Sequence, residues 1–251
     1  MSFGHGKQAV ILMSGFRMDS FLNSFDTSKT GDTAETTVFN SSDVKSYVPG
    51  KVDATLSAEG LFDGSITGID STLASALASS SEKVFTHWPQ GTSTGSFGVG
   101  MKTHQTTYDI STPIDDVVST SIEGQSNMGR DRVESLFELS TISTSSGNGA
   151  TNTNSTVNGS TAGSIKGAVG YLQKTDTSTG TITAASIQHS SCDIAASFGD
   201  LITFAAVGST VRSGQRVATG STNVKRYTRF KYTLGSSNHD SIVVNVGFSR
   251  K

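Results

Sequence analysis

Apolar and polar residues alternate along several short segments of the chain. The clearest case is Lys51–Glu59, where every second residue is apolar: Val52, Ala54, Leu56 and Ala58. A period of two is typical of a strand that buries one face. The same alternation recurs at residues 97–101, 202–206, 228–234 and 242–248. With Gly- and Ser-rich turns between these segments, the pattern predicts sheets in sandwiches or barrels.

One segment has a helical period instead. Ile66, Ile69, Leu73 and Leu77 recur at spacings of three and four, with alanines between them, which predicts a helix over 66–78. Either Asp63 or Ser65 is expected to cap its start. Its expected role is to cover an open face or edge of the first sheet.

The composition agrees with a mainly β chain. The 251 residues include 41 Ser, 33 Thr and 27 Gly, together about 40% of the chain. These residues favour pleated surfaces and turns and disfavour a helical bundle. The 13 Phe residues and the clean alternation argue against intrinsic disorder. The apolar run near the N-terminus, Ala9–Met13, is too short to span a membrane, so no membrane insertion is expected.

A long uncharged stretch suggests two domains. No charged residue occurs between Glu138 and Lys166, and residues 141–163 are almost entirely Ser, Thr, Asn, Gly and Ala. This segment is predicted to be a linker, which divides the chain into domains at 1–140 and 164–251. The first domain carries 9 Lys and Arg against 17 Asp and Glu, a net −8, whereas residues 141–251 carry 10 against 4, a net +6.

Residue patterns typical of catalysis or metal binding are weak. Gly91–Gly95 matches the G-x-S-x-G pattern around Ser93, but a strand-like segment follows where a nucleophile elbow needs a helix. A small hydrolase using Ser93 would react with fluorophosphonates, and we expect no such reaction. The five histidines lack metal-ligand spacing, and the single Cys192 excludes an internal disulfide and is typical of synthesis in a reducing cytoplasm. No catalytic residue, metal or cofactor is therefore predicted.

Two charged clusters have alternative interpretations. Asp115 and Asp116 are interpreted as a solvated turn, because adjacent strand residues point to opposite faces and would not share a proton. Lys225, Arg229 and Lys231 share one face of a predicted strand with Tyr227. That face is either simply solvated or a surface for anionic partners, including acidic patches of neighbouring subunits.

The order of the motifs in the first half resembles the tail tube (major tail) proteins of long-tailed bacteriophages. The residues concerned are Ser46–Gly50, the strand Lys51–Glu59, the segment Gly60–Gly64 and the helix that follows. The resemblance covers roughly residues 8–137. The second half is similar to a C-terminal β domain of some phage tail proteins, but Phe198 stands near a position where those domains often have Trp. No ligand-binding role is carried over to that position.

The resemblance implies a tail-tube-type β-sandwich or barrel with one flanking α-helix, followed by a smaller β-sandwich domain. It implies a structural, non-enzymatic virion protein, made in the host cytoplasm, whose subunits associate into stacked rings and contact other tail proteins. DNA would pass through the lumen without specific binding, and acidic walls would suit this. Tyr47, Val48, Pro49 and Gly50 are the expected subunit contacts. The alternative is a decoration or adhesion protein whose C-terminal domain binds carbohydrate on the host surface.

Overall fold

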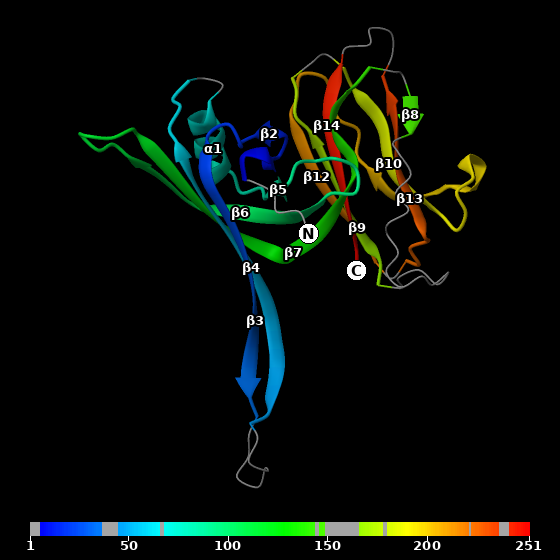
Figure 1. The fold of residues 1–251 in the computed structure, drawn as a ribbon, viewed down its shortest axis with the longest axis horizontal. Coiled ribbons are helices and arrows are strands. Elements are labelled where there is room, and N and C mark those ends of the chain that lie inside the picture. Colours follow the sequence, from blue (N-terminus) through cyan, green and yellow to red (C-terminus); the bar gives the residue numbers. More distant parts are fainter. Residues whose placement is uncertain are drawn as a thin grey trace. The chain divides into compact units, whose positions relative to one another are not determined.

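The computed structural model describes residues 6–36, 45–65, 68–143, 146–148, 166–177, 180–220, 222–235 and 241–251. Within these residues the chain is mainly antiparallel β-structure with a single α-helix, so the predicted fold class is confirmed (Figure 1). No helix in this described part is long and apolar enough to cross a membrane.

The elements follow one another with short connections over most of the described chain. In chain order they are η1 (Gly6–Gln8), β1 (Val10–Met13), β2 (Phe16–Arg17), β3 (Leu22–Glu35), β4 (Tyr47–Leu61), α1 (Ile69–Ala78), β5 (Lys83–Trp88), β6 (Phe97–Ser111), β7 (Ser119–Ile142), β8 (Ser146–Asn148), β9 (Ala168–Lys174), β10 (Ile182–Ser190), η2 (Ala195–Ser197), β11 (Gly199–Phe204), β12 (Ser213–Thr219), β13 (Tyr227–Leu234) and β14 (Ile242–Arg250).

The chain folds into two compact units. Unit 1 comprises Met1–Ser20, Lys83–Gly100 and Asp131–Lys251, and unit 2 comprises Phe21–Glu82 and Met101–Arg130. β6 and β7 run through both units, so neither unit is a continuous stretch of sequence. Most of the predicted linker at 141–163 lies outside the described residues, although β7 extends to Ile142 and β8 falls within the segment. The division into 1–140 and 164–251 stays a prediction.

Unit 2 is built around β4. This strand pairs with β3 on one side and with β7 on the other, from Leu61↔Ser119 to Ala54↔Ser126. The alternation expected for Lys51–Glu59 is present, because Ala54, Leu56 and Ala58 are all buried.

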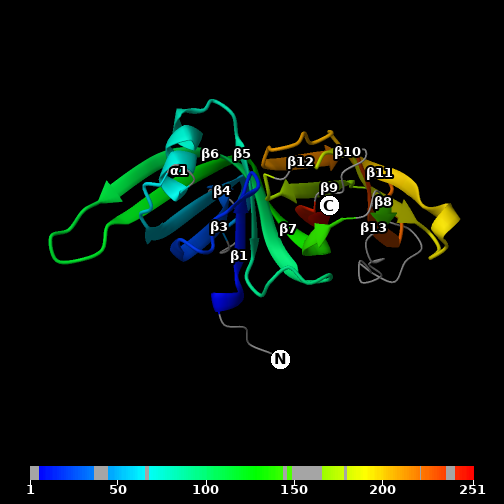
Figure 2. The same ribbon diagram turned by 90° about the horizontal axis from the view of Figure 1, so that it is seen from above.

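The helix of unit 2 begins three residues later than predicted. α1 spans Ile69–Ala78 and buries Ile69, Leu73 and Ala76, whereas Leu77 is 42% exposed. Its N-cap residue is Gly68, with no side-chain cap, so neither expected capping side chain acts as one. Tyr108 of β6 donates a hydrogen bond to Asp70 in the first turn of α1, and both views of the ribbon show α1 beside β6 (Figure 2).

Unit 1 contains two sheets that face each other across one apolar core. The larger sheet has the strand order β12-β9-β14-β7-β6-β5-β1-β2, and the smaller has the order β11-β10-β13-β8. The core takes buried side chains from both sheets, among them Leu172, Val244, Val246, Ile187, Ile202 and Phe230. The sheets approach closely at Gly170, where an added Cβ would lie 2.8 Å from the Ile187 side chain.

Candidate subunit-contact surface

A long exposed part of unit 2 is the end of the β3–β4 hairpin that lies beyond Ala54. β7 pairs with β4 only as far as Ala54, and beyond that point residues 47–53 pair with β3 alone. We call residues 28–35 and 47–53 the arm. Figure 1 shows it as a two-stranded ribbon that continues past the rest of its sheet. Two strands alone are marginally stable in water, so such a ribbon gains stability from a further partner.

Both faces of the arm are open to solvent. Every side chain of the arm is exposed, including Tyr47 at 54%, Val48 at 53% and Val52 at 54%. On the same strand Ala54 is only 1% exposed. Burying a Val side chain fully stabilises a protein by about 1.5–3 kcal/mol relative to leaving it in water. The arm therefore carries apolar surface that would favour association.

The four residues expected to contact a subunit lie together at the start of β4. Tyr47, Val48 and Pro49 pair with Glu35, Ala34 and Thr33 of β3. Pro49 lacks a backbone N–H, and this is tolerated because β4 has no neighbour on its other side here. Next to it, an added Cβ on Gly50 would lie 2.9 Å from the Asp32 Cβ, beside a register shift in β3. That these residues contact another subunit stays a prediction.

A long free edge, which the motifs in the sequence did not predict, accompanies these residues. Among the described strands, β3 pairs only with β4, so its other edge is unpaired over 14 residues. Unpaired backbone N–H and C=O groups on an edge can accept a strand from another chain. The signal in the sequence is that residues 28–35 lack alternation: both faces are polar, as suits a ribbon exposed on both sides.

Polar contacts fix the base of the arm. The guanidinium of Arg130 on β7 donates to the Thr27 carbonyl at 2.9 Å and to its hydroxyl at 3.0 Å. Gln125, also on β7, donates to the Asp53 carboxylate. Further out, Lys45 and Glu35 form an exposed ion pair at 3.1 Å, which adds little stability. The arm is therefore anchored where it leaves the sheet and exposed beyond.

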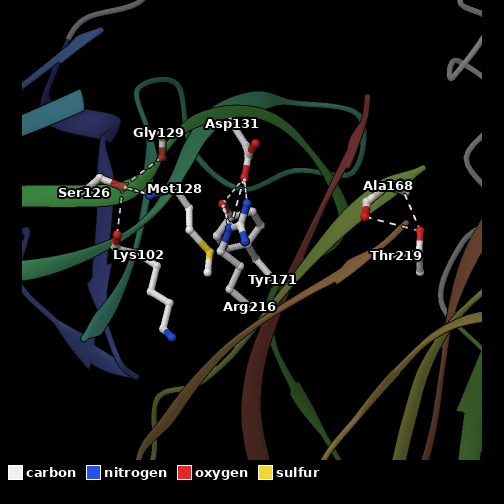
Figure 3. A network of polar contacts seen from close by, with 9 residues as sticks. All are labelled: Lys102, Ser126, Met128, Gly129, Asp131, Ala168, Tyr171, Arg216 and Thr219. Atoms are coloured by element: carbon white, nitrogen blue, oxygen red, sulfur yellow. Dashed lines mark hydrogen bonds and ion pairs between the residues drawn. The ribbon is translucent and has the colours of Figure 1, made fainter. Parts of the chain in front are cut away.

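Other polar clusters in the described residues have structural explanations. Asp131 accepts hydrogen bonds from Tyr171 at 2.5 Å and from the Arg216 guanidinium at 2.8 Å, as Figure 3 shows. Burial of the Tyr171 ring, which is 0% exposed, raises the pKa of its hydroxyl well above the ordinary value. This network joins β7, β9 and β12. It braces unit 1.

The candidate residues for chemistry fall in unremarkable surroundings. Ser93 lies in a loop before β6, where its carbonyl accepts a hydrogen bond from Ser96 N–H at 2.8 Å, as the sequence context predicted. Asp115 and Asp116 lie in the exposed turn between β6 and β7, again as predicted. Arg229 differs from the expectation of a solvated face: it is 8% exposed, because Phe198 stacks on it at 4.1 Å and the Ala195 carbonyl accepts its N–H.

Comparisons with known proteins give weak structural similarities. No family model matches the chain, and no curated protein matches it. Among solved structures, a chain from the virion of a native gene transfer agent particle is 17% identical with a TM-score of 0.40, over 49% of this chain and 94% of that one. The SPP1 Dit protein, described as a paradigm of the hub adsorption apparatus in phages that infect Gram-positive bacteria, is 9% identical with a TM-score of 0.39. That match covers 96% of this chain and 99% of the Dit chain.

A third similarity is to a chain of the phage p2 baseplate in its activated conformation. It is 9% identical with a TM-score of 0.34 and covers 97% of this chain and 98% of that one. At identities of 17% or less and TM-scores of 0.40 or less, these similarities assign no function.

Proposed function

We propose that the chain is a structural subunit of a phage-type tail and associates with copies of itself through the arm. The observation that carries this proposal is the arm itself: an anchored two-stranded ribbon with exposed Tyr47, Val48 and Val52 and a free edge along β3. A neighbouring copy that adds a strand to this edge would pair its backbone groups, and if it also covered a face of the ribbon it would bury these side chains. Repetition of such a head-to-tail contact closes into a ring when the rotation between copies permits it.

The finer proposal is a tail tube, in which rings stack around a channel that conducts DNA in the virion. The sequence resemblance over residues 8–137 supports it. The charge of unit 2 also supports it, because Phe21–Glu82 and Met101–Arg130 together carry 5 Lys and Arg against 13 Asp and Glu, a net −8. An acidic wall repels phosphates and forms none of the Lys and Arg contacts that bind DNA tightly.

Electron microscopy of the purified full chain tests the proposal. We expect rings or tubes with an open channel, and we expect the double variant Val48→Lys/Val52→Lys to remain monomeric, because two ammonium groups would be buried in the contact. The matched control is Ile194→Lys/Val211→Lys, which alters two exposed apolar residues of unit 1, 62% and 53% exposed, and should assemble normally. A wild-type chain that stays monomeric at all concentrations, or an arm variant that assembles as the wild type does, would refute the proposal.

Carbohydrate binding by residues 164–251 stays a prediction from the sequence. A glycan array probed with the full chain tests it independently, because assembly through the arm requires no affinity for sugars.

A further inference from the structure

A second exposed surface of unit 2 is the turn between β6 and β7. We call residues 109–117 the acidic turn. All nine residues are exposed; they include Asp109, Asp115 and Asp116 and contain no Lys or Arg. Ile114 is 100% exposed and Val117 is 62% exposed. A fully exposed Ile at the end of a hairpin, surrounded by carboxylates, is costly in an isolated chain and useful at an interface.

Two hydrogen bonds and a proline restrict the acidic turn. Asp116 accepts the Val117 N–H at 2.7 Å, and the Thr120 hydroxyl donates to the Asp109 carbonyl at 3.2 Å, which ties β7 to β6 just before the turn. Pro113 restricts the backbone further. Figure 2 shows the hairpin extending beyond α1, so the turn is accessible at the end of unit 2. A rigid, accessible turn loses little conformational entropy when it docks.

Unit 1 has a surface of opposite charge. We call Lys166, Lys225, Arg226, Arg250 and Lys251 the basic end.

Backbone contacts bring the three segments of the basic end together. Arg250 on β14 pairs with Ala168 on β9, and the next residue, Lys251, donates its N–H to the Gly167 carbonyl at 3.0 Å. The Arg250 guanidinium also donates to the carbonyls of Lys225 at 2.8 Å and Arg226 at 2.9 Å. Backbone pairing and the half-buried Arg250 side chain therefore hold the segments of the basic end together.

The local electrostatics leave this surface positive at neutral pH. Burial lowers the pKa of Arg250 to about 10, so its guanidinium stays protonated. The carboxylate of Glu134 opposes that shift and offsets part of one charge. His189 accepts the Lys225 N–H at 3.2 Å through Nδ1, and burial together with Lys225 and Arg250 lowers its pKa, as expected beside a positive cluster. The half-buried Tyr227, with Arg226 over its ring at 5.2 Å, adds apolar area next to the cations.

We propose that the acidic turn of one copy docks on the basic end of a second copy, burying Ile114 and Val117 against Tyr227. The partner is a second copy because the two surfaces, which belong to the same chain, are complementary in charge and in apolar content. The contact joins different surfaces of the two copies, so it propagates from copy to copy instead of stopping at a dimer. It rests on the proposed function only in requiring self-association, and it uses neither strand of the arm.

Sedimentation velocity of the full chain at two ionic strengths, about 50 and 500 mM, tests this contact, since salt screens interactions between exposed charges. Asp115→Lys/Asp116→Lys and Lys225→Glu/Arg226→Glu should each weaken association by about tenfold or more, a loss of about 1.4 kcal/mol or more, and lose the salt dependence. The matched control is Glu59→Lys/Glu123→Lys, which makes the same charge change on exposed positions of β4 and β7.

Exchange of charges between the two surfaces is the decisive test. An equimolar mixture of the two reversed variants should associate again, because the unchanged acidic turn of one meets the unchanged basic end of the other and the introduced lysines meet the introduced glutamates. A chain carrying all four substitutions, which retains only the reversed contact, should also associate. Failure of both rescues overturns the proposal, as does a control variant that weakens association equally.

Two further outcomes separate this proposal from its competitors. Suppose that Val48→Lys/Val52→Lys abolishes assembly, while both charge-reversed variants assemble and respond to salt as the wild type does. The proposed function then stands and this contact is refuted. If Lys225→Glu/Arg226→Glu loses binding to a fluorescent DNA duplex, measured by anisotropy, while self-association is unchanged, the basic end is a surface for phosphate polymers and the proposal is again refuted.

Discussion

Unit 1 and unit 2 differ in how completely each buries its own apolar residues. Unit 2 holds 92 of the 251 residues, yet nine of the twelve exposed large apolar side chains among the described residues lie in it. Among the described residues, unit 1 holds 30 of the 38 buried apolar residues, some between its two sheets and others, such as Trp88 and Tyr171, in a second cluster. Unit 1 therefore buries most of its own apolar residues, whereas unit 2 is a sheet with one helix that leaves part of its apolar surface exposed.

The two units also differ in net charge. Unit 2 has a net −8, whereas unit 1 carries 14 Lys and Arg against 8 Asp and Glu, a net +6. Cutting the chain at residue 140 gives the same two values, but residues 1–20, 83–100 and 131–140 together carry four charges of each sign. The whole acidic excess of the first half thus belongs to unit 2. Because the two units of a chain carry opposite net charges, copies of the chain attract one another more strongly than neutral molecules would.

The largest effect expected is in the core of unit 1. Phe230 is 0% exposed and its ring lies 5.4 Å from Phe137 and 5.7 Å from Tyr232. Phe230→Ala should lower the free energy of unfolding by about 3–5 kcal/mol. Fluorescence of Trp88, the single Trp and a buried residue of unit 1, follows this unfolding in denaturant. A loss below about 1 kcal/mol would show that unit 1 does not depend on this core.

The next effect concerns the buried network that braces unit 1. Asp131→Ala leaves the Arg216 side chain, which is 4% exposed, without its carboxylate partner. Removing the carboxylate partner of a buried charge costs about 3 kcal/mol or more, so the variant should unfold at a clearly lower denaturant concentration. Asp19→Ala is the control, because its Arg17 partner is 56% exposed and the ion pair contributes little. Equal losses in the two variants would contradict the role assigned to the network.

A third comparison uses two apolar residues of one strand. Leu56→Ala should destabilise unit 2 by about 2–3 kcal/mol, because Leu56 is 2% exposed. Val52 lies four residues earlier and belongs to the arm. Val52→Ala should change the stability of the monomer by less than about 0.5 kcal/mol. Hydrogen exchange of the β4 amides measures both. If Val52→Ala destabilises the monomer as much as Leu56→Ala does, the arm is covered within a single chain and the proposed contact fails.

The smallest effect is a dependence on pH in unit 1. Burial and the neighbouring Lys225 and Arg250 lower the pKa of His189, so the unfolded chain binds the proton more readily. The stability that the neutral imidazole contributes is present above its ordinary pKa of about 6.5 and is lost as pH falls through the lower folded value. Thermal melts of His189→Asn should therefore decline less steeply than those of the wild type as the pH is lowered below 6.5. Parallel curves would exclude this contribution.

The sequence predicted strands more reliably than it predicted what covers them. The alternation at Lys51–Glu59 identifies β4 and its buried face, but Val52 is exposed because β7 stops pairing with β4 at Ala54. The extent of a neighbouring strand depends on pairing between distant segments, which a local period does not report. The expected contact residues Tyr47–Gly50 come from a resemblance and stay a prediction, whereas the free edge of β3 is seen only in the topology.

Residues 97–101 show more clearly that a local pattern does not report which face of a strand is buried. Phe97 is 51% exposed and stacks under Arg132 at 4.0 Å, while the glycines between the apolar positions face the core. An added Cβ on Gly98 would lie 2.5 Å from the Trp88 ring, and one on Gly100 would lie 2.5 Å from the Tyr171 ring. The rings of Trp88 on the neighbouring strand β5 and of Tyr171 on β9 occupy the space that side chains at these positions would need. A hydrophobicity pattern that treats Gly as neither apolar nor polar therefore does not identify the buried face of Gly98 and Gly100.

The position of β14 affects how the chain folds during synthesis. β14 lies between β7 and β9 in the larger sheet, so the sandwich of unit 1 cannot close until residues 242–250 have left the ribosome. Every residue of unit 2, by contrast, has been made once residue 130 is reached. For the time needed to translate about 120 more residues, at about 5–20 residues per second, the arm and its free edge are present beside an unfinished sandwich. This interval is when nascent chains on neighbouring ribosomes could pair through their arms.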